Sequence, residues 1–100
     1  MRKVNLYVIY DAVAETFSMS PFTAINDNEA KRFFCMTMKD ANNAISENPH
    51  DFSILRVGKY DRITGEIKDT PHVKVLSGAE ALVIISPNND VNIIEEKEDE

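Results

Sequence analysis

The sequence predicts an α+β fold: a small antiparallel sheet of four to five short strands, with one amphipathic helix packed on a face. Residues 3–10 and 52–60 are rich in β-branched and aromatic side chains, which favours two long strands. Between them, residues 26–45 repeat apolar side chains at spacings of three and four, which is typical of an amphipathic helix. The chain has 100 residues, 43% of them hydrophobic, and this suits one small domain.

The first strand, residues 3–10, contains two alternating sets of side chains that would point to opposite faces of a sheet. The first set is Val4, Leu6, Val8 and Tyr10, and the second is Lys3, Asn5, Tyr7 and Ile9. Because the first set is apolar apart from one phenol, we expect it to face the core. Residues 16–18 would pair back as a short strand, and Pro21 favours extended backbone leading into residues 22–25.

The helix has start and stop signals at its two ends. Asn26 can cap it, and Glu29, three residues later, can reach back to complete a capping box. Asp27 adds negative charge near the positive end of the helix dipole. Asn48 and Pro49 end the helical pattern. The predicted buried face consists of Ala30, Phe33, Phe34, Thr37, Met38, Ala41, Ala44 and Ile45.

The second half of the chain predicts a hairpin. Residues 52–60 form one strand, whose alternating sets would be Phe52, Ile54, Arg56, Gly58, Tyr60 and Ser53, Leu55, Val57, Lys59. Residues 61–65 form the loop, in which Asp61 can accept hydrogen bonds from the backbone and Gly65 suits a left-handed position. Residues 66–68 return antiparallel, and Pro71 would separate them from a further short strand at residues 73–76. Residues 78–85 fit either a helix or a strand.

Charge divides the chain into a domain, residues 1–87, and an acidic tail, residues 88–100, which we expect to be disordered. The net charge is −6, and residues 90–100 contribute −5 of it through six acids and Lys97. The rest of the chain is therefore close to neutral. The tail is either a solvated charge run, or a segment that competes with DNA for a basic surface or binds a basic partner.

The single cysteine, Cys35, excludes an intramolecular disulfide and favours a reducing cytosol. We expect no signal peptide, because the apolar run near the start is short and ends at Asp11 without a cleavage pattern. No segment approaches the roughly 18 apolar residues of a membrane helix, so no membrane association is expected. A chain this short often gains stability by pairing with a copy of itself, so a homodimer is compatible with the sequence.

Several short motifs follow one another along the chain. They are L-Y-V-I-Y-D at residues 6–11, P-F followed by N-D within residues 21–27, A-K-R-F-F at 30–34, N-P-H-D-F-S-I-L-R-V-G-K-Y-D at 48–61, and T-G-E-I at 64–67. In this order they resemble the small nonstructural protein of gokushoviruses and related microviruses, bacteriophages with circular single-stranded DNA. The resemblance covers roughly residues 4–85. It implies a protein of the host cytoplasm, absent from the virion, that works with replication proteins during genome replication or the switch to single-strand synthesis and packaging.

The residues do not predict an enzyme, a metal site or a cofactor. His50 and His72 are the only histidines and lie 22 residues apart, each beside a proline. Metal sites usually gather several ligands, and these two histidines fit exposed loops better. Cys35 lies among apolar neighbours, where an inert thiol is expected. The three glycines form no phosphate-binding loop, so no catalytic residue is assigned.

A nucleic-acid surface is the remaining hypothesis. Single-strand binding surfaces combine cations for phosphates with aromatic faces for bases. The candidate residues are Lys3, Tyr7, Arg56, Lys59, Tyr60, Arg62 and Lys68. We expect Arg56, Lys59, Arg62 and Lys68 to contact phosphates, with Tyr7 or Tyr60 stacking on bases. Two alternatives stay open: these side chains only solubilise strands or pack in the core, or the protein is an adaptor that binds phage or host replication proteins and never DNA.

Overall fold

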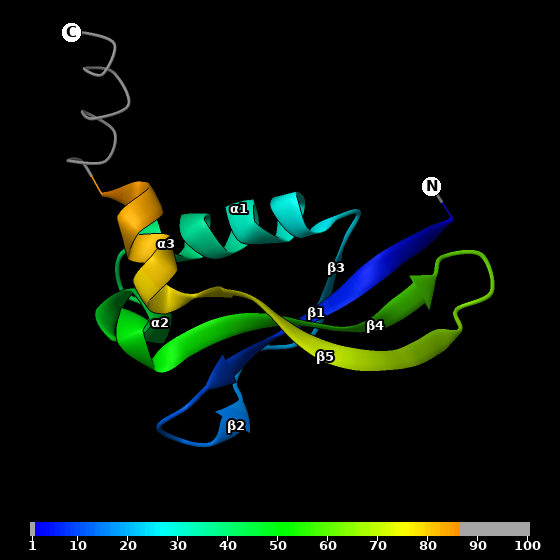
Figure 1. Cartoon of the computed structure of the whole chain (residues 1–100), viewed down its shortest axis with the longest axis horizontal. Helices are drawn as coiled ribbons and strands as arrows, with labels where there is room; N and C mark the ends of the chain where they lie inside the picture. The colour runs from blue at the N-terminus through cyan, green and yellow to red at the C-terminus, as the bar shows by residue number, and fades with distance from the viewer. Residues whose placement is uncertain (1, 87–100) are drawn as a thin grey trace, which may run out of the picture.

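The computed structural model describes residues 2–86, so the predicted acidic tail at residues 88–100 lies outside the described residues. The described part contains one antiparallel sheet of five strands (Figure 1). The strands are β1 (Lys3–Asp11), β2 (Thr16–Phe17), β3 (Phe22–Ala24), β4 (Phe52–Asp61) and β5 (Ile67–Ser77). They are ordered β2-β1-β4-β5, and β3 also pairs with β1. Together with the helices, this sheet confirms the predicted α+β fold.

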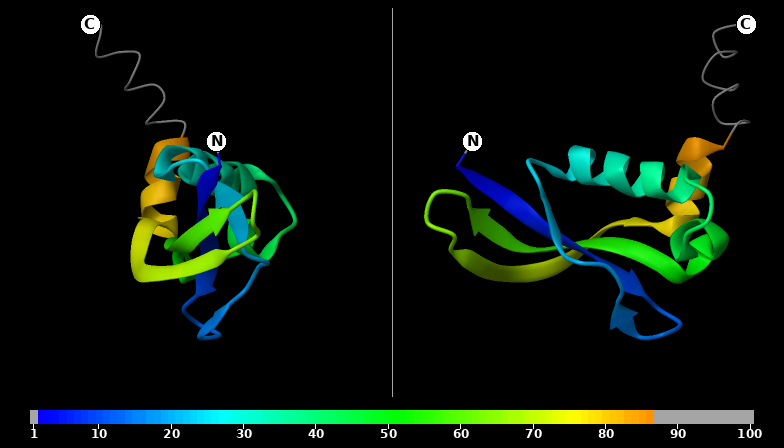
Figure 2. Two further views of the ribbon diagram at one scale, coloured as in Figure 1. Left: turned by 90° about the vertical axis from the view of Figure 1, so that its right-hand side faces the viewer. Right: turned by 180° about the vertical axis from the view of Figure 1, so that it is seen from behind.

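The helical segments are α1 (Asp27–Lys39), α2 (Ala44–Glu47), a 3-10 turn at Pro49–Asp51, and α3 (Gly78–Ile85). α1 lies across one face of the sheet, and α3 crosses the end of α1 at the far side from the hairpin (Figures 1 and 2). None of the helices within residues 2–86 has the length and apolar character needed to cross a membrane.

The prediction of one continuous helix over residues 26–45 is wrong, because α1 ends at Lys39. Asn42 adopts a left-handed backbone with φ of 70°, which no helix interior accommodates. Asn43 then caps the separate helix α2 through a capping box with Ser46. At the start of α1, Asn26 caps the helix as expected by accepting from the Glu29 amide at 2.9 Å.

The core lies between α1 and the sheet. Its largest fully buried side chains are Tyr7, Ile9, Phe34 and Ile54. The prediction for β1 is only partly right. Val4 and Val8 are buried as expected, but the core cluster under the helix contains Tyr7 and Ile9 from the other set, whereas Leu6 and Val8 line a hollow on the opposite face. Both sets of β1 are largely apolar, so alternation alone could not select between them.

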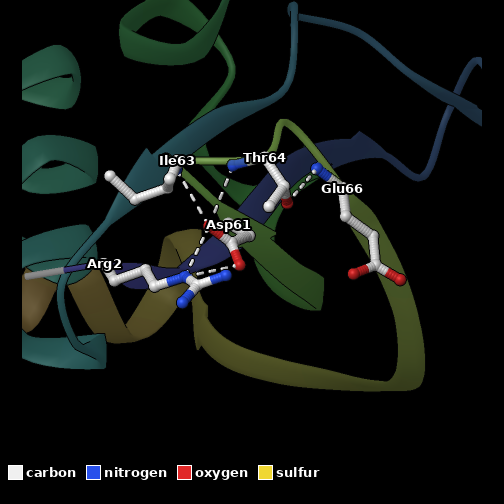
Figure 3. Close-up of polar contacts among 5 residues, drawn as sticks. All are labelled: Arg2, Asp61, Ile63, Thr64 and Glu66. Atoms are coloured by element: carbon white, nitrogen blue, oxygen red, sulfur yellow. Dashed lines mark hydrogen bonds and ion pairs between the residues drawn. The ribbon is translucent and has the colours of Figure 1, made fainter.

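The hairpin that joins β4 to β5 is built on Asp61, as predicted. Its carboxylate accepts from the Ile63 amide at 2.9 Å and from the Thr64 amide at 3.2 Å, and it also pairs with Arg2 (Figure 3). Gly65 takes the expected left-handed position, with φ of 80°. Asp61 is 5% exposed, so this carboxylate belongs to the scaffold of the loop.

β5 runs unbroken from Ile67 to Ser77, so the prediction that Pro71 separates two strands is wrong. The register with β4 shifts where Arg56 pairs with Val73 and Gly58 pairs with Asp69, and Pro71 lies inside this shift. The missing N–H of a proline is tolerated at such an irregularity, above all on an edge strand.

Candidate nucleic-acid interface

Three exposed lysines lie on one face of the sheet: Lys3 on β1, Lys59 on β4 and Lys68 on β5. Asn5 and Lys59 are register partners, and so are Lys59 and Lys68, while Lys3 lies two residues before Asn5 on the same face. We call these three lysines the basic face. They line a hollow together with Tyr60, Asp61 and Glu66. The hairpin that carries this surface extends beyond the N-terminal end of α1, so none of the helices within residues 2–86 covers it (Figure 1).

A β-bulge at Val57 assembles the basic face. β1 residues Leu6 and Tyr7 pair with Gly58 and Arg56, so β4 has one extra residue between them. An extra residue reverses which face the following side chains point to. Arg56 and Lys59 therefore lie on the same face, and Tyr60, the partner of Val4, lies on the opposite one.

A chain of hydrogen bonds connects the basic face to the start of α1. Lys59 Nζ donates to Asn5 Oδ1 at 2.9 Å, and Asn5 Nδ2 donates to the Tyr7 hydroxyl at 3.1 Å. The Tyr7 hydroxyl donates to Asp27 Oδ1 at 2.6 Å, and Arg56 Nη1 donates to Asp27 Oδ2 at 2.5 Å. The network orients Lys59 without neutralising it, because its partner is an uncharged amide. In contrast, the carboxylate of Asp27 offsets the charge of Arg56.

The pKa values in this network follow from its hydrogen bonds. Burial and the hydrogen bond to Asp27 raise the pKa of Tyr7 from 10.0 to about 12. Partial burial acts to raise the pKa of Asp27, but the hydrogen bonds from Tyr7 and Arg56 outweigh it and lower the pKa below 3.8. The hydrogen bond to Asp27 also raises the pKa of Arg56. At neutral pH the network is therefore a neutral phenol, a carboxylate and a guanidinium.

We predict that Tyr7→Phe removes part of the loss of stability at alkaline pH. Unfolded tyrosine ionises near pH 10, whereas folded Tyr7 ionises at about 12, so its contribution is complete below pH 10 and is lost as the pH rises to about 12. A difference of two pKa units corresponds to about 3 kcal/mol. Between pH 10 and about 12, the free energy of unfolding measured with urea should fall by about 3 kcal/mol more in the wild type than in Tyr7→Phe. Parallel stability curves for the two proteins would contradict the network.

The structure separates the seven predicted site residues into three groups. Lys3, Lys59 and Lys68 come together on the basic face, with Arg56 beside them in its ion pair with Asp27. Arg62 is exposed in the hairpin loop, next to this surface in the chain. The two tyrosines lie elsewhere.

The prediction that Tyr7 stacks on bases is wrong. Its side chain is 0% exposed, and its ring stacks on Phe22 with centroids 5.8 Å apart. Tyr7 and Arg56 are register partners on one face of the sheet, whereas the bulge turns Tyr60 to the other face. A base stacked on Tyr60 would therefore lie on the opposite face from the three lysines.

Sequence reasoning missed the polar partners of the site. Asp27 was interpreted only as a residue that favours the helix dipole, yet it is the acceptor for both Tyr7 and Arg56. Arg2 was not assigned a role, although its Nε lies 2.8 Å from the carboxylate of Asp61. An acid just after a helix cap gives no local sign of a partner 29 residues away, so only the register of the strands could have revealed this pair.

The opposite face of the sheet has a different character. Its hollow, of about 260 Å³, has mostly apolar lining with a few polar side chains. The lining residues are Leu6, Val8, Phe17, Val57, Gly58, Ile67, Lys68, Asp69 and His72. Phe17 is 51% exposed and Ile67 is 63% exposed. An exposed apolar patch of this kind is a common feature of surfaces that contact other proteins.

Within residues 2–86, no group of three or more histidine, cysteine or acidic side chains could hold a metal ion. The thiol of Cys35 is half-buried, and burial raises its pKa, with Lys39 acting in the opposite direction. A thiol with a raised pKa is a weak nucleophile at neutral pH.

Comparison with known protein families shows which family the chain matches. Residues 4–81 match the phage ORF5 protein family, and this range includes β1 apart from Lys3, β2 to β5, α1, α2 and the start of α3. No curated protein sequence and no solved structure matches the chain. The match includes Lys59, Lys68 and the hydrogen-bond network from Lys59 to Asp27, whereas Lys3 lies one residue before it. The chain therefore belongs to the phage ORF5 protein family.

Proposed function

We propose that this phage accessory protein binds single-stranded DNA without catalysis, through the phosphates. The observation that carries the proposal is the convergence of Lys3, Lys59 and Lys68, from three different strands, on an uncovered face. Lysines this close together repel one another unless an anion lies between them. The fold nevertheless positions Lys59 with a hydrogen bond from its ammonium group to Asn5.

The proposed surface recognises the negative charge of the phosphates and not the identity of the bases. Lys59 and Lys68 would contact neighbouring phosphates, with Lys3 and Arg62 extending the path at either side. Arg56 would act mainly by positioning, since Asp27 already offsets its charge. Because Tyr7 is buried and Tyr60 faces away, base stacking contributes little, and binding should be strongly dependent on salt.

The proposed biological setting combines the family with the resemblance to gokushoviruses and related microviruses. Such phages must cover or package single-stranded genomes, and a small stoichiometric protein with a phosphate-binding face suits genome replication or the switch to single-strand synthesis. We propose that the protein acts in the host cytoplasm, outside the virion, needs no cofactor and performs no catalysis. Its partners would be single-stranded DNA and phage or host replication proteins.

Fluorescence anisotropy with a labelled single-stranded oligonucleotide tests this function. With three to four phosphate contacts, log affinity should fall with log salt concentration at a slope of roughly −2 to −3, since each contact to a single strand contributes about −0.7. Oligonucleotides of different base composition should bind alike. Absence of binding even at low salt would exclude the proposal.

The second candidate function is a protein-interaction adaptor without direct DNA binding. The apolar face with Phe17 and Ile67 favours it, because exposed side chains of this size commonly become buried against a protein. A homodimer through this face is one form of such an interaction. In the same titration, the adaptor function predicts no anisotropy change at any salt concentration, whereas DNA binding predicts a large change at low salt.

A further inference from the structure

A second basic surface lies on the other side of the molecule from the hairpin, between α1 and α3. This hollow, of about 400 Å³, has charged and apolar lining. The charged side chains are Lys31, Arg32 and Lys39, and the apolar ones include Cys35, Met36 and Ile84. We call it the α1–α3 groove. It shares no residue with the basic face, and α3 crosses α1 beside it (Figure 2).

The groove combines exposed apolar surface with unbalanced positive charge. Met36 is 62% exposed and Ile84 is 46% exposed. Lys31 lies near Asp27 and Glu80, and it helps to lower the pKa of both carboxyl groups. Within residues 2–86, neither Arg32 nor Lys39 forms an ion pair. A ligand for this groove should therefore be acidic and carry apolar side chains.

The C-terminal segment of the same chain has this composition. Residues 87–100 read P-N-N-D-V-N-I-I-E-E-K-E-D-E. Three apolar residues, Val91, Ile93 and Ile94, stand between Asp90 and a strongly acidic run. A polyanion such as DNA also complements Arg32 and Lys39, but its sugar-phosphate backbone offers nothing comparable for Met36 and Ile84.

Chain connectivity places this segment beside the groove. Ile85, the last residue of α3, lines the groove, and the backbone of Ser86 is extended. Val91 follows Ile85 by six residues, which span up to about 20 Å when extended. The stretch of α1 from Asn28 to Lys39 is about 17 Å long. The segment can therefore reach every part of the groove, at the high effective concentration that a short connection provides.

We propose that residues 87–100 bind in the α1–α3 groove of their own molecule. Val91, Ile93 and Ile94 cover Met36 and Ile84, and the acids that follow lie against Arg32 and Lys39. This inference does not rest on DNA binding. It assigns the acidic segment to the helical side of the molecule, so that Lys3, Lys59 and Lys68 remain accessible.

Paramagnetic broadening in the full-length chain tests the proposal. A nitroxide is attached to Lys97→Cys in a Cys35→Ala background, and amide signals are compared before and after reduction of the nitroxide. The amides of Arg32, Lys39 and their neighbours on α1 should lose most of their intensity, while those of the β4–β5 hairpin keep theirs. Broadening of the hairpin instead would overturn the proposal, because the tail would then lie on the basic face.

Three further samples test which surface binds the segment and whether it belongs to the same molecule. Arg32→Glu with Lys39→Glu should restore the α1 signals, whereas Lys59→Glu with Lys68→Glu, an equal change of charge on the other side, should leave them broadened. Both pairs are exposed, so the spectra should show a folded protein. Mixing nitroxide-labelled chains with unlabelled, isotope-enriched chains should give no broadening. Broadening in that mixture would show binding to a second molecule and would overturn the proposal.

Discussion

Replacing Gly78 with alanine is expected to destabilise the fold by about 3 kcal/mol. A Cβ at this position would lie 1.7 Å from the carbonyl oxygen of Pro49 and 3.0 Å from that of Phe52. Both are backbone atoms, one in the 3-10 turn and one at the start of β4, so no side chain can rotate away. Relief requires α3 to move as a unit, and this would open its contacts with α1.

Thermal unfolding checks this expectation. For a domain of this size, 3 kcal/mol lowers the melting temperature by well over 10 °C. Gly65→Ala is the matched control, because Gly65 has nothing within 4 Å of a new Cβ but has φ of 80°. Its cost should be about 1 kcal/mol, from backbone strain alone. If Gly78→Ala cost no more than Gly65→Ala, the close contact between α3 and the turn would not exist.

The parts of the fold that could be predicted are those specified by neighbouring residues. Asn26 caps a helix within three residues of itself, and Asp61 with Gly65 closes a loop within five. In both cases the side chain that forms the hydrogen bond and the backbone that it stabilises lie in the same short segment, so the sequence alone indicates the local structure. The strands β1 and β4 were likewise predictable, because β-branched and aromatic residues are dense in both.

The errors arise where a choice depends on residues far apart in the chain. The bulge at Val57 is a property of the pairing between β1 and β4. Its local sign is Gly58, because a glycine inside a strand often marks a bulge, but that sign does not show which side chains the bulge brings together. This bulge nevertheless determines whether Tyr60 or Lys59 lies on the same face of the sheet as Arg56. In the same way, both faces of β1 are apolar enough to be buried, and only the docking of α1 selects Tyr7 and Ile9.

The candidate site was therefore predicted in its charges but not in its arrangement. Lys3, Lys59 and Lys68 were all identified from their residue types and from their places on strands. That Lys59 pairs with Lys68 follows from the register of the β4–β5 hairpin, which the Asp61 turn sets. The partners of the buried polar groups, Asp27 above all, could not be predicted, because their spacing along the chain has no period.

Reversing the charge of Lys59 and Lys68 together is expected to weaken single-stranded DNA binding by roughly 100-fold or more, since charge-assisted hydrogen bonds contribute about 1.5–3 kcal/mol each. The two lysines are register partners, so Lys59→Glu with Lys68→Glu places two carboxylates at the centre of the basic face. Anisotropy titrations at several salt concentrations should also show a salt slope that is shallower by between one and two.

The control for this loss is on the same strand. Lys74→Glu changes the net charge as much as Lys68→Glu does, and both lysines are exposed on β5. However, Lys74 pairs with Leu55, which pairs with Val8 on the opposite face. If phosphates bind the basic face, Lys68→Glu alone should weaken binding about tenfold and Lys74→Glu by much less. Equal losses from the two would mean that DNA responds only to the overall charge of the protein, and that the face created by the bulge at Val57 has no role in binding.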